Sequence, residues 1–287
     1  MRYARPEDLD RAIKDRLRKE SQETGLPLSY LRKRLAVERF LARLAAGSNE
    51  GLVVTGAFAL STLLNTRRPT QDLDLEAWDS VPDLWDLLQA IAERRVEDGF
   101  SFLIRPKGRF QRGWVRRFTL DARLGGALFE EVALDVHILE RAPVEPVRKR
   151  LPGVLAFAGI EPPEVLMAPL TWQYANKLHA YARARKGPRS RVKDLVDLAV
   201  LTLELPERVD SADLIAAIDQ VYAFYGGPSW RDLSLPDPPR DWRSEFGLMA
   251  KDAGLDPPDM DHWFRKVRDQ YEKLRAQASA AGGEPLV

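Results

Sequence analysis

The sequence predicts an α/β protein of the α+β type, with a lobe built on a mixed sheet followed by a C-terminal helical lobe. Short segments with alternating apolar and polar residues lie between about residues 52 and 139. Helical periodicity dominates from about residue 160 onward. At 287 residues the chain exceeds the usual size of one domain. We therefore expect domains over residues 1–150 and 151–287, with the boundary between about 145 and 160.

Periodicity and turn residues define the elements of the first lobe. Two amphipathic helices come first, and the hydroxyl of Ser29 can cap the second. A strand, a tight turn at Gly56 and a helix follow. After them we expect a strand, a helix and three alternating segments that pair antiparallel. In chain order, the expected ranges are 6–20, 29–46, 52–54, 57–64, 72–76, 82–97, 101–105, 113–122 and 128–139.

The second lobe is expected to be helical throughout. A Pro-rich stretch at 227–239 interrupts its helical pattern. The expected helices cover residues 162–184, 191–203, 211–224 and 258–278.

Composition is typical of a folded, soluble protein, with 45% hydrophobic and 30% charged residues. The chain has no cysteine, which excludes disulfides, thiolate zinc sites and a cysteine nucleophile. The charged N-terminal segment is unlike a secretory signal, and no apolar run approaches the roughly 18 residues of a membrane span. We therefore expect a cytoplasmic protein without a membrane partner.

Positive charge is concentrated in two segments, although the net charge is only +1. Residues 105–117 and 183–193 contain six basic residues each and no acid. Phe110, Trp114 and Phe118 interleave the first segment, a pattern that suits either stacking on bases or packing within a sheet. The basic residues are Arg105, Lys107, Arg109, Arg112, Arg116, Arg117, Arg183, Arg185, Lys186, Arg189, Arg191 and Lys193.

Asp72 and Asp74 are candidate metal ligands. Side chains alternate along a strand, so these two carboxylates share one face while Leu73 and Leu75 point to the core. Their α-carbons are expected to lie roughly 6.5 to 7 Å apart, which lets the side chains converge on one cation. Hard oxygen ligands of this kind suit Mg²⁺ or Mn²⁺ better than Zn²⁺.

Asp135 is the third candidate metal ligand. It interrupts a strongly apolar strand, 128–139, where an acid is costly unless it is paired or metal-bound. Together with Asp72 and Asp74 it would form a site for two metals about 3.5 to 4 Å apart, as in phosphoryl-type transfer. The alternative is a salt bridge with an arginine of the 105–117 segment.

This order of elements resembles the nucleotidyltransferase superfamily and, within it, the AbiEii/AbiGii toxin family, which includes the MenT toxins of type IV toxin–antitoxin systems. Four blocks carry the resemblance, which covers most of the chain: Thr55–Leu60, Arg67–Leu75, Ala175–Ala180 and Arg191–Leu198. The first block departs from the usual family form because Thr55, Ala57 and Phe58 stand where a basic residue, a second glycine and a small hydroxyl residue are usual. A backbone amide cradle for phosphate at the helix N-terminus is retained.

The resemblance implies a nucleotidyltransferase-like fold with Asp72 and Asp74 on the metal and Lys177 on the nucleotide phosphates. It also places Asp194 in the active site. From the residues alone, Asp194 and Asp197 lie three apart on one helix face, so one could be catalytic and the other structural. Lys177 is expected on a helix whose apolar seam contains Leu166, Leu170, Tyr174 and Leu178. The nucleotide-binding residues are expected to be Gly56, Ala57, Arg68 and Lys177.

The implied reaction transfers a nucleoside monophosphate from a nucleoside triphosphate to the 3′ end of tRNA, with Asp135 completing a second metal site or acting as a base. The resemblance also implies a cognate antitoxin. Two alternatives remain: an antibiotic-type nucleotidyltransferase acting on a small molecule, and a catalytically silent nucleotide- or partner-binding module. The sequence does not distinguish among the four nucleoside triphosphates.

Overall fold

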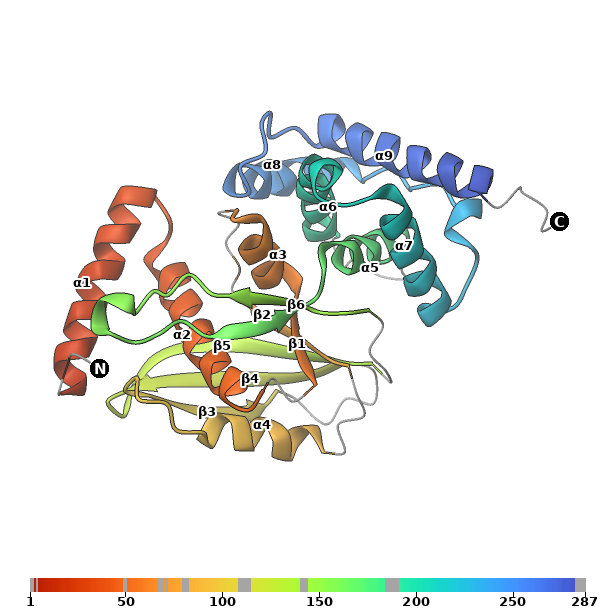
Figure 1. The fold of residues 1–287 in the computed structure, drawn as a ribbon. Helices are drawn as coiled ribbons and strands as arrows, with labels where there is room; N and C mark the ends of the chain where they lie inside the picture. Colours follow the sequence, from red (N-terminus) through yellow and green to blue (C-terminus); the bar gives the residue numbers. More distant parts are fainter. Residues whose placement is uncertain are drawn as a thin grey trace. The chain divides into compact units, whose positions relative to one another are not determined.

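The computed structural model describes residues 3, 5–48, 51–66, 70, 72–78, 83–107, 115–139, 144–183 and 191–281 (Figure 1). Contacts divide the chain into two units, Met1–Thr62 with Pro69–Ala168 and Leu63–Arg68 with Pro169–Val287. The first unit is mixed α/β and the second is helical, which confirms the predicted fold class.

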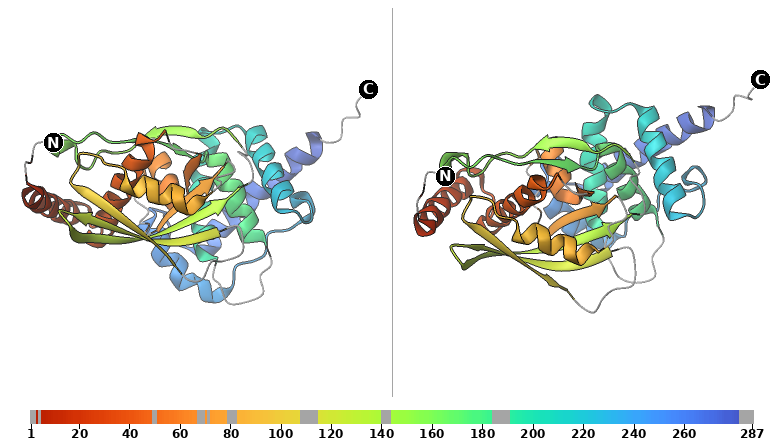
Figure 2. Two further views of the ribbon diagram at one scale, coloured as in Figure 1. Left: turned by 90° about the horizontal axis from the view of Figure 1, so that it is seen from below. Right: turned by 60° about the horizontal axis from the view of Figure 1, so that its bottom comes forward.

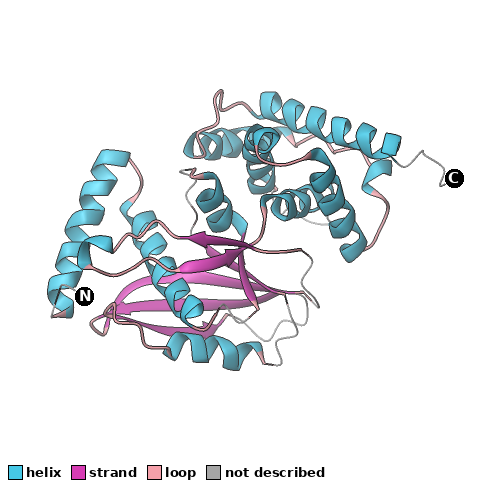
Figure 3. Ribbon diagram, in the orientation of Figure 1, coloured by secondary structure: helices cyan, strands magenta, loops and turns pink. Residues whose placement is uncertain are grey.

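One mixed sheet of seven strands organises the first unit (Figure 3). The strand order is β3-β4-β5-β2-β1-β7-β6. β2 pairs parallel with β5 and β1 pairs parallel with β7, while the other neighbouring pairs are antiparallel. The strands are β1 Leu52–Thr55, β2 Asp72–Ala77, β3 Phe100–Pro106, β4 Val115–Leu124, β5 Ala127–Ile138, β6 Val147–Arg150 and β7 Glu164–Met167.

Four α-helices accompany this sheet in the described part of the first unit. α2 packs against β5 and β7, and α4 packs against β3. Figure 2 shows α2 and α4 side by side, and contacts between the two helices confirm this arrangement. α1 packs against α2 through apolar residues at helical spacing. The helices are α1 Pro6–Thr24, α2 Leu28–Ala46, α3 Gly56–Leu64 and α4 Leu84–Glu93.

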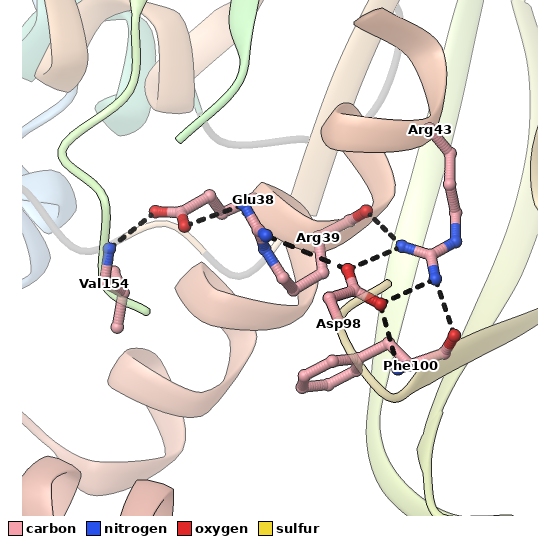
Figure 4. Close-up of polar contacts among 6 residues, drawn as sticks. All are labelled: Glu38, Arg39, Arg43, Asp98, Phe100 and Val154. Carbon is pink, nitrogen blue, oxygen red and sulfur yellow. Dashed lines mark hydrogen bonds and ion pairs between the residues drawn. The ribbon is translucent and has the colours of Figure 1, made fainter. Parts of the chain in front are cut away.

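A buried charge network joins α2 to the start of β3 (Figure 4). The guanidinium of Arg43 donates two hydrogen bonds of 2.9 Å to Asp98, and both side chains are buried. Arg39 lies 3.1 Å from Glu38 and 3.8 Å from Asp98. The backbone N–H of Val154 donates to Glu38, which links α2 also to the loop after β6. Burial raises the pKa of Glu38, although neighbouring Arg39 opposes that shift.

The sheet continues further along the chain than the sequence predicts. β6 and β7 were not expected, and with them the first unit reaches Ala168 instead of ending near residue 150. The expected helix from residue 162 begins only at Leu170, after Pro169. Consequently Leu166 lies in β7 and not in the predicted helical seam. The apolar run of β7 is too short for periodicity to separate strand from helix.

The second unit packs its helices around α6. α6 contacts α5, α8 and α9, and nine of the ten residues from Val192 to Leu201 are buried, the exception being Lys193. α5 also packs against α7. α8 was not expected from the sequence. The α-helices are α5 Leu170–Ala182, α6 Val192–Glu204, α7 Ser211–Tyr225, α8 Arg243–Asp252 and α9 Met260–Ala281. Across the described residues, no helix combines the length and apolar character needed to cross a membrane.

Candidate active-site residues and family membership

A row of polar residues runs across four strands of the sheet. In the strand register, Asp74 on β2 lies opposite Thr55 on β1 and Asp135 on β5. Asp135 in turn lies opposite Arg117 on β4. Residues directly opposite in register share one face of a sheet. The fold therefore brings Asp74 and Asp135 together from segments 61 positions apart.

Asp72 and Asp74 lie on β2 as the alternation predicts. Leu73 and Leu75 are fully buried, whereas Asp72 is exposed and Asp74 is half-buried. The third acid of the strand, Glu76, is buried and accepts a hydrogen bond of 2.5 Å from the indole of Trp78. β2 thus offers two carboxylates, and not three, toward solvent.

Gly56 lies directly against the carboxylate of Asp74. Its φ of 69° is in the left-handed region, and α3 begins at this residue. A Cβ at position 56 would lie only 2.8 Å from Cγ of Asp74. Glycine at this turn therefore lets β2 place an acid at the N-terminus of α3, where amide N–H groups favour negative charge.

Asp135 forms a salt bridge with Arg117. The Nε of Arg117 donates to Oδ2 of Asp135 over 3.2 Å, and both side chains are partly exposed. The pairing with an arginine of the 105–117 segment is therefore present. Within the described ranges, no group of three or more His, Asp or Glu side chains is arranged to hold a metal ion. Asp72 and Asp74 remain the carboxylates whose oxygen donors and shared face fit Mg²⁺.

A second polar cluster lies in the helical unit between α5 and α6. The Nζ of Lys177 is 2.7 Å from Oδ2 of Asp197 and 3.4 Å from Oδ1 of Asp194. Arg191 reaches the other oxygen of Asp194 at 2.6 Å. The side chain of Asp197 is fully buried, whereas that of Lys177 is 21% exposed. Both predicted residues, Lys177 and Asp194, thus belong to one ion-pair network.

Asp197 is the functional candidate that the sequence did not single out as the partner of Lys177. A buried carboxylate is stable only when it is paired, and Lys177 supplies a cation 2.7 Å from that of Asp197. The spacing of Asp194 and Asp197 indicates that both face the same way, but it does not show which helix supplies the cation.

Aromatic side chains adjoin this cluster on α5 and α7. The imidazole of His179 stacks on the ring of Tyr225, with centroids 4.5 Å apart and planes 7° apart. Tyr222 contacts His179 edge-on. Burial lowers the pKa of His179, and the charges of Arg183 and Arg191 lower it further. His179 therefore makes packing contacts with these two tyrosines.

Several predicted residues lie outside the described residues: Arg68 of the nucleotide-binding set, together with Arg109, Phe110, Arg112, Trp114, Arg185, Lys186 and Arg189. Of the aromatic residues in the first basic segment, Phe118 is buried and stacks on Trp85 at 6.1 Å. Packing therefore explains Phe118. Arg105, from the same segment, pairs with Asp121 and Glu131.

Three solved structures are similar to this chain. MenT4, a nucleotidyltransferase toxin from Mycobacterium tuberculosis H37Rv, is 20% identical, with a TM-score of 0.57 over 91% of this chain and 89% of that chain. JHP933 from Helicobacter pylori is 17% identical, with a TM-score of 0.49 over 90% of this chain and 96% of its own. A second Helicobacter pylori structure is 17% identical, with a TM-score of 0.50 over 89% and 99%.

Comparison with curated protein sequences gives no significant match. The model of a sequence family, described as the nucleotidyl transferase AbiEii toxin of type IV toxin–antitoxin systems, matches residues 39–273. That match includes β1, β2, β5, α5 and α6, which carry the two polar clusters. The chain therefore belongs to the AbiEii family of nucleotidyl transferase toxins.

Proposed function

We propose that this nucleotidyltransferase uses Mg²⁺ or Mn²⁺ to transfer a nucleoside monophosphate from a nucleoside triphosphate to the 3′ end of tRNA, releasing pyrophosphate and stopping translation. The observation that carries the proposal is the close approach of Asp74 to Gly56. It places a carboxylate of β2 beside the N-terminus of α3, so that a metal ligand and amide donors for phosphate lie next to each other.

Asp72 and Asp74 are the proposed metal ligands. Mg²⁺ is commonly bound by one or two carboxylates together with substrate phosphates, so two protein ligands are sufficient. When bound, the ion would neutralise charge on the triphosphate. The exposure of Asp72 and the half-burial of Asp74 leave both carboxylates accessible to a soluble nucleotide.

The proposed phosphate contacts come from backbone and from lysine. The amides of Gly56 and Ala57 at the start of α3 would bind phosphate oxygens, and Arg68 would add a positive charge. The ammonium of Lys177 would offset the charge that develops on the leaving pyrophosphate. Asp194 and Asp197 hold that ammonium in place.

Asp135 is assigned to the acceptor. Its carboxylate, in register with Asp74, would accept the proton of the attacking hydroxyl or bind a second cation, and Arg117 fixes its position. tRNA as acceptor is supported by the resemblance to MenT toxins and by the arginines on β4. We also propose a cytoplasmic location and a cognate antitoxin, because the family is one of type IV toxin–antitoxin systems.

The test is to incubate the protein with Mg²⁺, total tRNA and each labelled nucleoside triphosphate in turn. We expect the label to appear on tRNA. Asp74→Ala should reduce the rate of this labelling at least roughly 100-fold. Glu131→Ala is the matched control, because Glu131 is an exposed acid on the same strand as Asp135 and pairs only at the surface with Arg105. It is expected to retain activity.

The other outcomes separate the alternative functions. Label on a small hydroxylated or amino compound but not on tRNA would indicate an antibiotic-type enzyme. Absence of transfer to any acceptor, with nucleotide binding retained, would indicate a silent module and would contradict the proposal.

A further inference from the structure

Thr55 is the last residue of β1 and directly precedes the glycine turn at which α3 begins. The residue is only 8% exposed. In the strand register it lies opposite Asp74, so both side chains are on the same face of the sheet. The carboxylate of Asp74 in turn lies against Gly56. Thr55 therefore brings a hydroxyl group to the N-terminus of α3, next to the proposed metal ligand.

The segment from Thr55 to Thr62 contains three hydroxyl side chains, and two of them are bonded within α3. Ser61 and Thr62 donate hydrogen bonds of 3.0 and 2.8 Å to the backbone carbonyl of Phe58. The side chain of Thr55 makes no hydrogen bond to any part of the chain that the structure describes. A hydroxyl on a residue that is nine-tenths buried is costly unless it finds a partner. A bound molecule can supply that partner.

Thr55 also stands where a side chain commonly caps a helix. Threonine directly before the first turn usually accepts a hydrogen bond from an amide of that turn. Asp83 and Asp210 cap α4 and α7 in this way. Among the described residues, Thr55 accepts no such bond, although α3 is nine residues long. The amides at the start of a helix have no intrahelical partner, so these amides and the Thr55 hydroxyl can bind the same anion.

We propose that the hydroxyl of Thr55 donates a hydrogen bond to a phosphate oxygen of the nucleoside triphosphate. The inference rests on the proposed nucleotidyl transfer and adds a phosphate-binding residue to it. A phosphate bound by the amides at the start of α3 lies beside Thr55, because Thr55 and Gly56 are adjacent in the chain. A hydroxyl group has one proton to donate, and a charged phosphate oxygen makes the resulting bond stronger than a neutral acceptor would.

The experiment compares the full-length wild type with Thr55→Val, which keeps the branched shape without the hydroxyl, and with Thr55→Ser, which keeps the hydroxyl. Calorimetry in Mg²⁺ buffer measures the affinity for inorganic tripolyphosphate and for each nucleoside triphosphate. Thr62→Val is the matched control, because it makes the same substitution at a hydroxyl that is bonded within α3. Thermal melts of the free proteins measure their stability.

We expect Thr55→Val to weaken binding of tripolyphosphate and of the nucleoside triphosphates by the same factor, roughly 10- to 100-fold, because a hydrogen bond to a charged acceptor is lost. Thr55→Ser and Thr62→Val should bind nearly as the wild type does. The melting temperature of Thr55→Val should be no lower than that of the wild type, because valine suits a strand and its introduction leaves no described group unpaired.

Three results would overturn the proposal. The first is an unchanged affinity of Thr55→Val for tripolyphosphate. The second is an equal loss in Thr55→Val and Thr55→Ser, which would assign the effect to packing and not to the hydroxyl. The third is a Thr55→Val protein that needs more Mg²⁺ but binds tripolyphosphate normally at saturating Mg²⁺, because the hydroxyl would then act on the Asp74 carboxylate.

Failure of the proposed function gives a different result. A wild-type protein that binds tripolyphosphate through Thr55 but labels no acceptor would contradict the transfer reaction and retain the phosphate contact. A protein that transfers nucleotide without any dependence on Thr55 would contradict this inference alone. A wild-type protein that binds neither tripolyphosphate nor nucleoside triphosphate would contradict both.

Discussion

At the scale of single residues, the contact between Gly56 and Asp74 predicts a strong requirement for glycine. Gly56→Ala would add both the cost of a left-handed backbone, about 1 kcal/mol or more, and a collision with the Asp74 carboxylate. We expect a lower melting temperature and loss of nucleotide transfer by at least roughly 100-fold. Thermal melts and the labelling assay measure the two effects separately.

Gly25→Ala is the control for this substitution. Gly25 has a φ of 73°, but an added Cβ there meets nothing within 4 Å. The Gly25→Ala variant should therefore have a lower melting temperature but retain full transfer activity. If Gly56→Ala remains as active as Gly25→Ala, the proposed placement of Asp74 by the glycine turn is wrong.

Asp197 is predicted to act through Lys177. Asp197→Asn should slow transfer on the order of 100-fold because the lysine loses its buried counter-ion. In a Lys177→Met background the same substitution should have little further effect, since residues that act through one another show non-additive losses. The measurement is a double-mutant cycle on kcat/KM at constant pH.

A pair elsewhere in the helical unit provides the control for the cycle. Asp219 bonds to Arg231 at 2.8 Å and lies outside the lysine cluster. Asp219→Asn should change stability but not kcat/KM. Losses that multiply in the Lys177→Met, Asp197→Asn double variant would show that Asp197 does not act through the lysine.

At the scale of elements, the charge network of Figure 4 predicts that α2 depends on Asp98 for its attachment to β3. Asp98→Ala would leave two buried arginines, Arg39 and Arg43, without this counter-ion. We expect a loss of about 3 to 5 kcal/mol in the free energy of unfolding. Chemical denaturation measures it.

Glu161→Ala is the comparison for a surface pair. Glu161 bonds to Arg150, and both side chains are mostly exposed. The expected loss is below about 1 kcal/mol. Similar losses in Asp98→Ala and Glu161→Ala would contradict the claim that burial makes the Asp98 network important.

The elements also show what local sequence can and cannot predict. Alternation along β2 predicts correctly that Leu73 and Leu75 are buried opposite Asp72 and Asp74. The register of Asp74 with Asp135 depends on parallel pairing of distant strands, which no local pattern encodes. β7 was read as helix because a short apolar run fits both periods.

The candidate site was predictable to a similar extent. Family resemblance predicts Lys177 and Asp194 as site residues, but the closer pairing of Lys177 with Asp197 depends on how α5 packs against α6. The salt bridge between Arg117 and Asp135 was an open alternative, because an acid in an apolar strand predicts a partner without identifying it. Tertiary contacts determine these details.

At the scale of the whole molecule, the proposed metal should support catalysis and not folding. The buried cores of both units are formed mainly by apolar side chains, and Asp72 is exposed. Removal of divalent ions with EDTA should therefore abolish transfer while shifting the melting temperature by less than about 3 °C. Mg²⁺ or Mn²⁺ should restore activity, and unfolding upon chelation would contradict this assignment.

The assignment of α3 to both units has a consequence for how such proteins can be recombined. Gly56 to Thr62 belongs to the first unit, whereas Leu63 to Arg68 belongs with the chain after Pro169. Neither unit is one uninterrupted stretch of sequence. A single crossover between related genes therefore cannot exchange either unit intact, and a chimera joined at residue 168 would inherit a foreign segment at 63–68.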